Sequence, residues 1–306
     1  LKTLTGELER RASGTTFLEV SGREFAAVVV PKPPLPEQRQ IAAILDTLDD
    51  AIRKTEQIIA KLKQVKQGLL HDLLTRGIDD NGELRDPERH PEQFKESALG
   101  RIPKAWEVAS VRRLTTLLTY GFTNPMPTVD EGPWMLTAAD IADGSVRWGG
   151  ARRTSRAAFT SLLTAKSRPL PGDLLLTKDG TLGRMAMLDR HDVCINQSVA
   201  LLRCSEGWLR DLLFVYLRSP PGQERMLADA GGSTIKHIYI SKLGDMTVPK
   251  PARQESKAIA AVVGAAEERL ALDESALAKL RLLKAGLMED LLTGRVRVTP
   301  LLENSP

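Results

Sequence analysis

Two segments of the chain repeat apolar residues at alternating steps of four and three positions, the spacing of helices that pack along a seam. Residues 37–75 carry Ile41, Leu45, Leu48, Ile52, Ile59, Leu62, Leu69 and Leu73, with Thr55 and Lys66 as polar members of the stripe. Residues 255–293 carry Ile259, Val263, Ala266, Leu270, Leu277, Leu280, Leu287 and Leu291, with Asp273 and Lys284 as polar members. Prolines precede both segments, and Gly77 and Gly294 follow them, as expected at helix ends. We therefore predict two long helices, over 35–78 and 252–294, that pack on each other as a coiled-coil spacer.

Between these helices the pattern changes to short apolar runs separated by turn residues, which is typical of strands. The runs are residues 134–136, 174–176, 185–188 and 199–202. Residues 208–218 and 221–230 have the pattern of amphipathic helices. We expect residues 101–251 to form a mixed α/β (α+β) domain of unknown strand order, and the polar residues 79–100 to form a linker.

The chain also resembles itself at a spacing of 218 residues. Val30-Pro31-Lys32-Pro33 recurs as Val248-Pro249-Lys250-Pro251, and Asp72-Leu73-Leu74-Thr75 recurs as Asp290-Leu291-Leu292-Thr293. The same spacing pairs Gly14 with Gly232, Thr16 with Thr234, Glu37 with Glu255 and Ile41 with Ile259. This spacing is too long for a solenoid and indicates a duplicated module. We therefore expect residues 1–34 to be the C-terminal remnant of a first globular domain, whose front lies upstream of residue 1, and residues 295–306 to be a tail.

The composition is that of an ordinary globular protein and narrows the function mainly by exclusion. The 306 residues are 42% hydrophobic and 27% charged, with a net charge of +4, which is compatible with nucleic acid but does not indicate it. Two cysteines, Cys194 and Cys204, and four scattered histidines favour neither a disulfide framework nor a metal site. No apolar run has the length of about 18 residues that a membrane span needs, so we expect a cytoplasmic protein with no membrane partner.

Motifs for catalysis are absent from the sequence. There is no phosphate-binding GxxxxGK[ST] loop and no GxSxG nucleophile elbow. The stretch nearest to a base-holding Asn-Pro-Pro-aromatic tetrad is Asn124-Pro125-Met126-Pro127, which lacks the second of two adjacent prolines and the aromatic residue. These absences disfavour a nucleotide-hydrolysing site, a serine-nucleophile elbow and direct methyl transfer to DNA by this chain.

Positive charge is concentrated in residues 147–190, which hold nine basic and three acidic residues. Arginine suits both phosphate contacts and bidentate reading of guanine, whereas the alternative is a solvated basic face. The carboxamides of Asn196 and Gln197 fit two interpretations: they read adenine edges, or they belong to a β-turn whose hydrogen bonds are satisfied within the chain. The polar residues at 236–239 fit either DNA recognition or random variation of an exposed surface. The candidate DNA-binding residues are Arg152, Arg153, Arg156, Lys178, Thr181, Arg184, Asn196, Gln197, Lys236, His237 and Tyr239.

Three stretches resemble the specificity (S) subunits of type I restriction-modification systems. The central helical region of that family is similar to residues 35–42, Leu-Pro-Glu-Gln-Arg-Gln-Ile-Ala, and to the long helix after them, which ends with residues 66–77, Lys-Gln-Gly-Leu-Leu-His-Asp-Leu-Leu-Thr-Arg-Gly. Residues 99–108, Leu-Gly-Arg-Ile-Pro-Lys-Ala-Trp-Glu-Val, resemble the start of a target recognition domain, and 172–183 resemble its interior. One departure is Gln254-Glu255-Ser256 in place of Pro36-Glu37-Gln38.

The resemblance implies a chain that recognises DNA and catalyses nothing. In that family each of two target recognition domains reads one half of a split site in double-stranded DNA. Two antiparallel helices set the spacing and hold methyltransferase (M) subunits, and restriction (R) subunits join the complex. No cofactor is expected on this chain, with S-adenosylmethionine and ATP/Mg on the partner subunits. Three alternatives stay open: the C-terminal portion of a two-domain subunit, a half-length form that pairs with itself, and a coiled-coil module with a non-DNA ligand domain.

Overall fold

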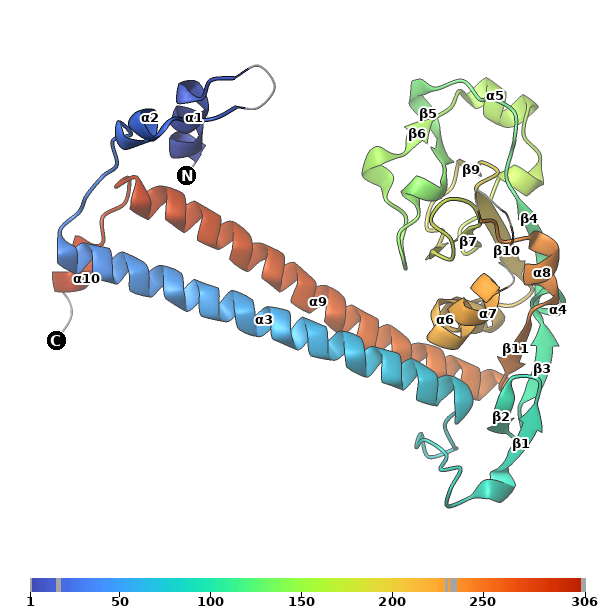
Figure 1. The fold of residues 1–306 in the computed structure, drawn as a ribbon. Coiled ribbons are helices and arrows are strands. Elements are labelled where there is room, and N and C mark those ends of the chain that lie inside the picture. The colour runs from blue at the N-terminus through green and yellow to red at the C-terminus, as the bar shows by residue number, and fades with distance from the viewer. Residues whose placement is uncertain (1, 15–17, 229–230, 232–235, 304–306) are drawn as a thin grey trace. The chain divides into compact units, whose positions relative to one another are not determined.

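The computed structural model describes residues 2–14, 18–228, 231 and 236–303 (Figure 1). It divides into two compact units. The central unit comprises residues 65–266, and the terminal unit comprises the residues up to Gln64 together with those from Glu267 onward. Gly232, Thr16 and Thr234, which the sequence repeat pairs with other positions, lie outside the described residues.

The central unit is a mixed α/β structure built on small sheets. Its four-stranded antiparallel sheet has the order β4-β10-β7-β8, formed by Thr115–Tyr120, Val199–Cys204, Leu174–Thr177 and Met185–Met187. A three-stranded sheet has the order β6-β5-β9, with β5 antiparallel to β6 and parallel to β9, formed by Arg152–Arg153, Val129–Leu136 and Val193–Ile195. Two antiparallel pairs, β1-β2 and β3-β11, comprise Phe94–Ser97, Gly100–Pro103, Glu107–Ser110 and Thr247–Lys250.

Helices cover these sheets and complete the hydrophobic core. The four apolar runs predicted as strands are confirmed in β5, β7, β8 and β10, whose central side chains are buried. The helix predicted over 208–218 is confirmed as α6 (Gly207–Arg218), and the next one is α7 (Pro220–Ala228). Shorter helices of the unit are α4 (Val111–Leu114), α5 (Arg156–Ser161) and α8 (Ile240–Asp245). In the terminal unit, α1 (Lys2–Arg11), α2 (Gly22–Ala26) and α10 (Thr299–Glu303) are also short.

The two predicted long helices are confirmed as α3 (Leu35–Thr75) and α9 (Arg253–Leu292) (Figure 1). Every member of both predicted stripes, including the four polar members, is buried or partly buried. Beyond each helix lies a glycine with positive φ, 63° at Gly77 and 75° at Gly294, a conformation that glycine adopts without steric cost. The heptad spacing therefore identified the covered faces of both helices.

Ion pairs show that the helices run antiparallel within the terminal unit. Four residues of α3 form ion pairs with residues of α9 or of the segment after it. In order along α3, the pairs are Glu37 with Arg297, Asp49 with Lys284, Glu56 with Arg281, and Lys63 with Glu274. The partner numbers fall as the α3 numbers rise. The Lys284 ammonium, predicted as a polar member of the stripe, thus neutralises the Asp49 carboxylate across the helix pair. An apolar cluster of Ile41, Leu291 and Val298 lies beside the first ion pair.

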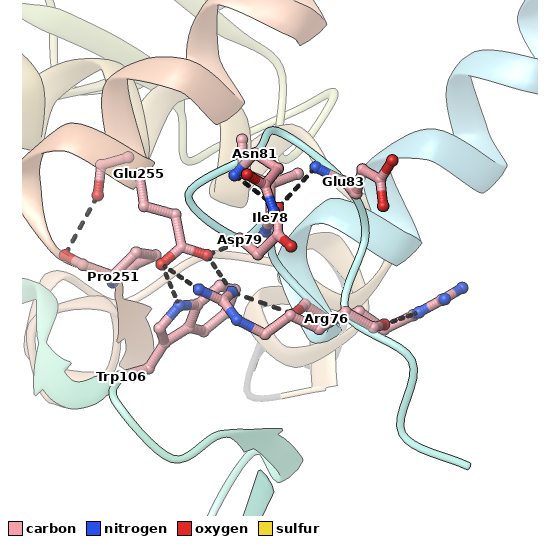
Figure 2. Close-up of polar contacts among 10 residues, drawn as sticks. Arg76, Ile78, Asp79, Asn81, Glu83, Trp106, Pro251 and Glu255 are labelled. Atoms are coloured by element: carbon pink, nitrogen blue, oxygen red, sulfur yellow. Dashed lines mark hydrogen bonds and ion pairs between the residues drawn. The ribbon is translucent and has the colours of Figure 1, made fainter. Parts of the chain in front are cut away.

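In the central unit, the carboxylate of Glu255 near the start of α9 binds three groups (Figure 2). Glu255 accepts hydrogen bonds from the Ile78 backbone N–H at 3.0 Å, from Trp106 Nε1 at 2.9 Å and from Arg85 Nη1 at 2.5 Å. The Trp106 side chain is fully buried. These contacts hold the start of α9, the segment after α3 and the loop between β2 and β3 together.

The segment predicted as a linker over 79–100 is more structured than we expected. It contains strand β1 and a 3₁₀ turn at Pro91–Gln93, and the Phe94 side chain is buried. The prediction relied on its polar composition, which is misleading because a two-stranded antiparallel ribbon can bury side chains on one face while the other face meets solvent. None of the described helices has the length and apolar character needed to cross a membrane.

Adjacent isoleucines in α3 provide a test of the helix seam. Ile59 is 7% exposed and Ile58 is 49% exposed. We expect Ile59→Ala to lower the free energy of unfolding by about 2 kcal/mol or more, and Ile58→Ala to change it by no more than about 0.5 kcal/mol. Urea titration followed by circular dichroism measures both. Equal effects of the two substitutions would show that α3 does not bury its predicted stripe.

Candidate nucleic-acid interface

The sheet topology brings several predicted site residues to one edge of the central unit. Pairing of Tyr120 with Ala200 and of Thr177 with Val199 places the end of β4, the end of β7 and the start of β10 together. In the neighbouring sheet, pairing of Leu136 with Ile195 places the ends of β5 and β9 together. The loops that leave these strand ends carry the side chains at 178–184 and 196–198. We call this edge the loop edge.

Hydrogen bonds within the loop of residues 196–198 and to Phe122 fix the conformation of its backbone. Asn196 Oδ1 accepts from the Ser198 backbone N–H at 3.1 Å and from Ser198 Oγ at 2.6 Å. The Gln197 backbone N–H donates to the Phe122 carbonyl at 2.8 Å. The oxygen of the Asn196 carboxamide is thus committed to the turn, while the Gln197 side chain is exposed.

A hollow of about 290 Å³ lies at this loop. Its lining includes three predicted residues, Arg152, Asn196 and Gln197, together with Phe122 and Asn124, which our sequence analysis did not propose. An aromatic ring beside carboxamide and guanidinium groups offers both stacking and hydrogen bonding, the two means by which proteins contact bases. The signal in the sequence was an aromatic residue and a carboxamide directly after the β4 apolar run.

Lys178 and His237 meet at the same edge through Asp179. The Lys178 ammonium lies 2.8 Å from Asp179 Oδ1, and His237 Nδ1 lies 2.6 Å from the same oxygen. Lys178 Nζ also lies 5.3 Å from the centroid of the Tyr120 ring, a cation–π contact. Lys178 therefore anchors the loop by its own contacts, whereas Lys236 and Tyr239 nearby in the chain are exposed.

The glycine loop between β7 and β8 is a hairpin connection. Thr177 Oγ1 accepts from the Arg184 backbone N–H at 2.9 Å and donates to the Thr181 carbonyl. Gln223 Nε2 donates to the Gly183 carbonyl at 2.9 Å. These bonds fix the backbone and leave Thr181 exposed and Arg184 partly exposed.

Arg153 and Arg156 lie at a different hollow from Arg152. Side chains alternate across a strand, so Arg152 and Arg153 of β6 take opposite sides. Arg153 lies 3.7 Å above the Trp134 ring, and Arg156 forms two bonds to Asp192, of 2.7 and 2.5 Å. Both guanidinium groups line a second hollow of about 600 Å³. The structure therefore does not bring all the predicted arginines together.

Aromatic rings and an arginine lie in contact beside this second hollow. These contacts were not predicted from the sequence. The rings of Trp134 and Trp148 lie 5.4 Å apart edge to face, and Arg190 lies 4.4 Å over Trp148. Among the described residues, no group of three or more histidine, cysteine, aspartate or glutamate side chains is placed to hold a metal ion.

Comparison with known proteins gives matches of one kind. The family model "Type I restriction modification DNA specificity domain" matches residues 1–64. The MjaVIII type I restriction enzyme specificity subunit of Methanocaldococcus jannaschii is 23% identical over 98% of this chain and 70% of its own length. The EcoBI specificity subunit of Escherichia coli is 26% identical over 82% of this chain. The chain spans 54% of the length of that second relative.

A solved structure from a study of the complex assembly and conformational transition of the type I R-M system shares the fold. It aligns with a TM-score of 0.59 and 19% identity, over 96% of this chain and 68% of its own length. At this identity the likeness concerns the fold alone.

The Arg156–Asp192 pair provides a pH test of the second hollow. The hydrogen bond from Arg156 holds the pKa of the Asp192 carboxyl below its ordinary value, against the opposing effect of burial. We expect Arg156→Gln to raise the Asp192 pKa toward its ordinary value, as followed by carboxyl carbon NMR. In the unsubstituted chain, stability from this pair is present above the unfolded-state pKa and is lost as pH falls through the folded-state pKa. An unchanged Asp192 titration would contradict the pairing.

Proposed function

The chain is a relative of the type I restriction-modification specificity subunits, and on that premise we propose that it recognises one half of a bipartite DNA sequence. The observation that carries the proposal is the loop edge, where Arg152, Asn196 and Gln197 surround a hollow beside Phe122. The Arg152 and Gln197 side chains match the major-groove code, in which arginine reads guanine and a carboxamide reads adenine, while the Asn196 oxygen holds the turn. Gln197 stands on a loop and Arg152 on the short strand β6, and both are supported by buried strands, an arrangement in which recognition side chains are commonly placed.

The contacts within the chain favour different roles for its cations. The described structure gives no protein partner for the guanidinium groups of Arg152 and Arg184, which are therefore the groups best suited to contact DNA. Arg153 stacks on Trp134 and Arg156 pairs with Asp192, so we propose that both hold the second hollow in shape. Lys178, tied to Asp179, fixes the loop edge and reads no base. Lys178 was among the candidate DNA-binding residues of the sequence, and we now propose a structural role for it.

We propose that the chain supplies recognition and no catalysis. Methyltransferase subunits, carrying S-adenosylmethionine, would methylate adenine, and restriction subunits would use ATP and Mg²⁺. In this proposal the 218-residue repeat provides two similar docking surfaces, residues 1–34 are the remnant of a first recognition domain, and residues 101–251 form the second. A cytoplasmic location stays a prediction.

Exposed leucines on α9 support docking of a partner by the long helices. Leu272 and Leu283 are separated by three helical turns and so share a face, and both are exposed, as is the adjacent Leu282. On α3, Ile58 is also exposed. Clustered exposed apolar side chains mark interaction surfaces more often than isolated ones do.

Neighbouring arginines test the DNA proposal. We expect the chain to enrich a short sequence from a pool of random duplexes. Arg152→Ala should weaken binding and, if it neutralises one phosphate, flatten the dependence of log affinity on log salt by about 0.9. Arg153→Ala should leave the salt slope unchanged and instead lower the unfolding temperature. Fluorescence anisotropy at several salt concentrations measures the slopes. A chain that enriches no sequence, or equal DNA effects of the two substitutions, would refute the assignment.

The docking proposal has a matched control within the chain. Leu272→Glu combined with Leu283→Glu should abolish co-purification with a co-expressed type I methyltransferase subunit from the same organism, because a charge would be buried against the partner. Leu18→Glu, at a leucine 69% exposed compared with 68% for Leu272, should leave co-purification intact. Retained binding by the double variant, with an unchanged circular dichroism spectrum, would exclude this face.

A further inference from the structure

Two glutamates near the starts of the long helices have equivalent surroundings. In the central unit, the nearly buried carboxylate of Glu255 binds Arg85, Ile78 and Trp106. In the terminal unit, the nearly buried carboxylate of Glu37 binds Arg297 at 2.5 and 2.8 Å and Thr299 Oγ1 at 3.2 Å. Each carboxylate thus binds the segment that follows the other long helix, since Arg297 and Thr299 follow α9 as Ile78 and Arg85 follow α3.

A hydrogen bond beside each glutamate is also repeated. Gln38 Nε2 donates to the Pro33 carbonyl at 2.8 Å, and Ser256 Oγ donates to the Pro251 carbonyl at 3.3 Å. The two donors and the two acceptors are each separated by the 218 positions of the sequence repeat. The different side chains at 38 and 256 therefore perform the same local task.

A cavity of about 200 Å³ lies beside Glu37. Seven of its nine lining residues pair, at the spacing of 218, with residues of the Glu255 region. The pairs are Pro31 with Pro249, Lys32 with Lys250, Pro33 with Pro251, Glu37 with Glu255, Ile41 with Ile259, Leu291 with Leu73, and Val296 with Ile78. The cavity is therefore the counterpart of the site that surrounds Trp106.

The two sites differ at the place of the indole. A methyl group added at Gly77 would lie 2.3 Å from the Glu255 carboxylate, 2.5 Å from the Trp106 ring and 2.6 Å from Arg85, whereas one added at Gly294, which lines the cavity, would meet nothing within 4 Å. A cavity of about 150 Å³ lined by apolar groups accommodates a benzene ring, so about 200 Å³ suits an indole. The Glu37 carboxylate offers the acceptor that an indole N–H needs when it is buried.

We propose that the cavity beside Glu37 binds the indole of a tryptophan in an Ile-Pro-x-x-Trp segment that lies outside residues 1–306. Trp106 occupies the equivalent site at the end of such a segment, Ile102-Pro103-Lys104-Ala105-Trp106. The indole N–H donates to Glu37, and the ring packs on Ile41, Leu291 and Val296. The proposal does not require DNA binding, so its failure and the failure of the DNA proposal are distinguishable.

A peptide with the sequence of residues 97–110 serves as the probe, because it contains the Ile-Pro-x-x-Trp segment. We expect the fluorescein-labelled peptide to bind the full chain saturably at concentrations up to about 1 mM, which a short tether would supply. A peptide carrying Trp106→Ala should bind at least about tenfold more weakly. With benzoylphenylalanine at the tryptophan position, photo-crosslinks should form to residues 31–41 and 291–297.

Two valines of similar exposure provide the matched chain variants. Val296→Phe should fill the cavity and weaken peptide binding at least about tenfold, whereas Val262→Phe, at an exposed valine outside it, should have no effect. The proposal is overturned by absence of saturable binding, by equal binding of the two peptides, or by equal binding of the two variants. It also fails if sedimentation shows a dimer of the chain that the peptide dissociates, since a second copy would then be the occupant.

Discussion

The central unit depends on one nearly buried carboxylate, that of Glu255. A charge removed from water is costly unless several donors surround it, and Glu255 has an arginine, an indole N–H and a backbone N–H. The donors come from Arg85, Trp106 and Ile78, which are distant from Glu255 in the sequence. Breaking such a network leaves partner groups unpaired, so the start of α9, the segment after α3 and the β2–β3 loop are fixed by a common interaction.

The carboxylate of Glu37 in the terminal unit is bound by an arginine and a further donor, as the carboxylate of Glu255 is in the central unit. Glutamates 218 positions apart each bind an arginine beyond the end of the other long helix. The arginines themselves, Arg85 and Arg297, are not paired by that spacing. The position of the carboxylate is thus repeated while the donor reaches it from different places.

The helices were predictable because their seam recurs every seven residues, so that Ile59 and its neighbour Ile58 are assigned to opposite faces by spacing alone. The strands were predictable from short buried runs, but their order was not, since it depends on pairings such as Leu136 with Ile195 between distant segments. The repeat singled out Glu255, yet Trp106 and Arg85 as its partners were not visible from spacing.

The candidate interface was predictable only in part. Local charge density selected residues 147–190, but counting charges ignores the alternation of side chains along β6, which separates Arg152 from Arg153. It also ignores acidic partners brought from elsewhere in the chain, as Asp192 is to Arg156. The loop edge has a further consequence for the history of such proteins. Arg152 and Gln197 are exposed on elements whose backbone is held by buried neighbours, so substitutions at these positions change the chemistry offered to a ligand without a cost in folding. If these side chains contact DNA as proposed, selection can alter the sequence that the chain recognises while the scaffold is inherited unchanged.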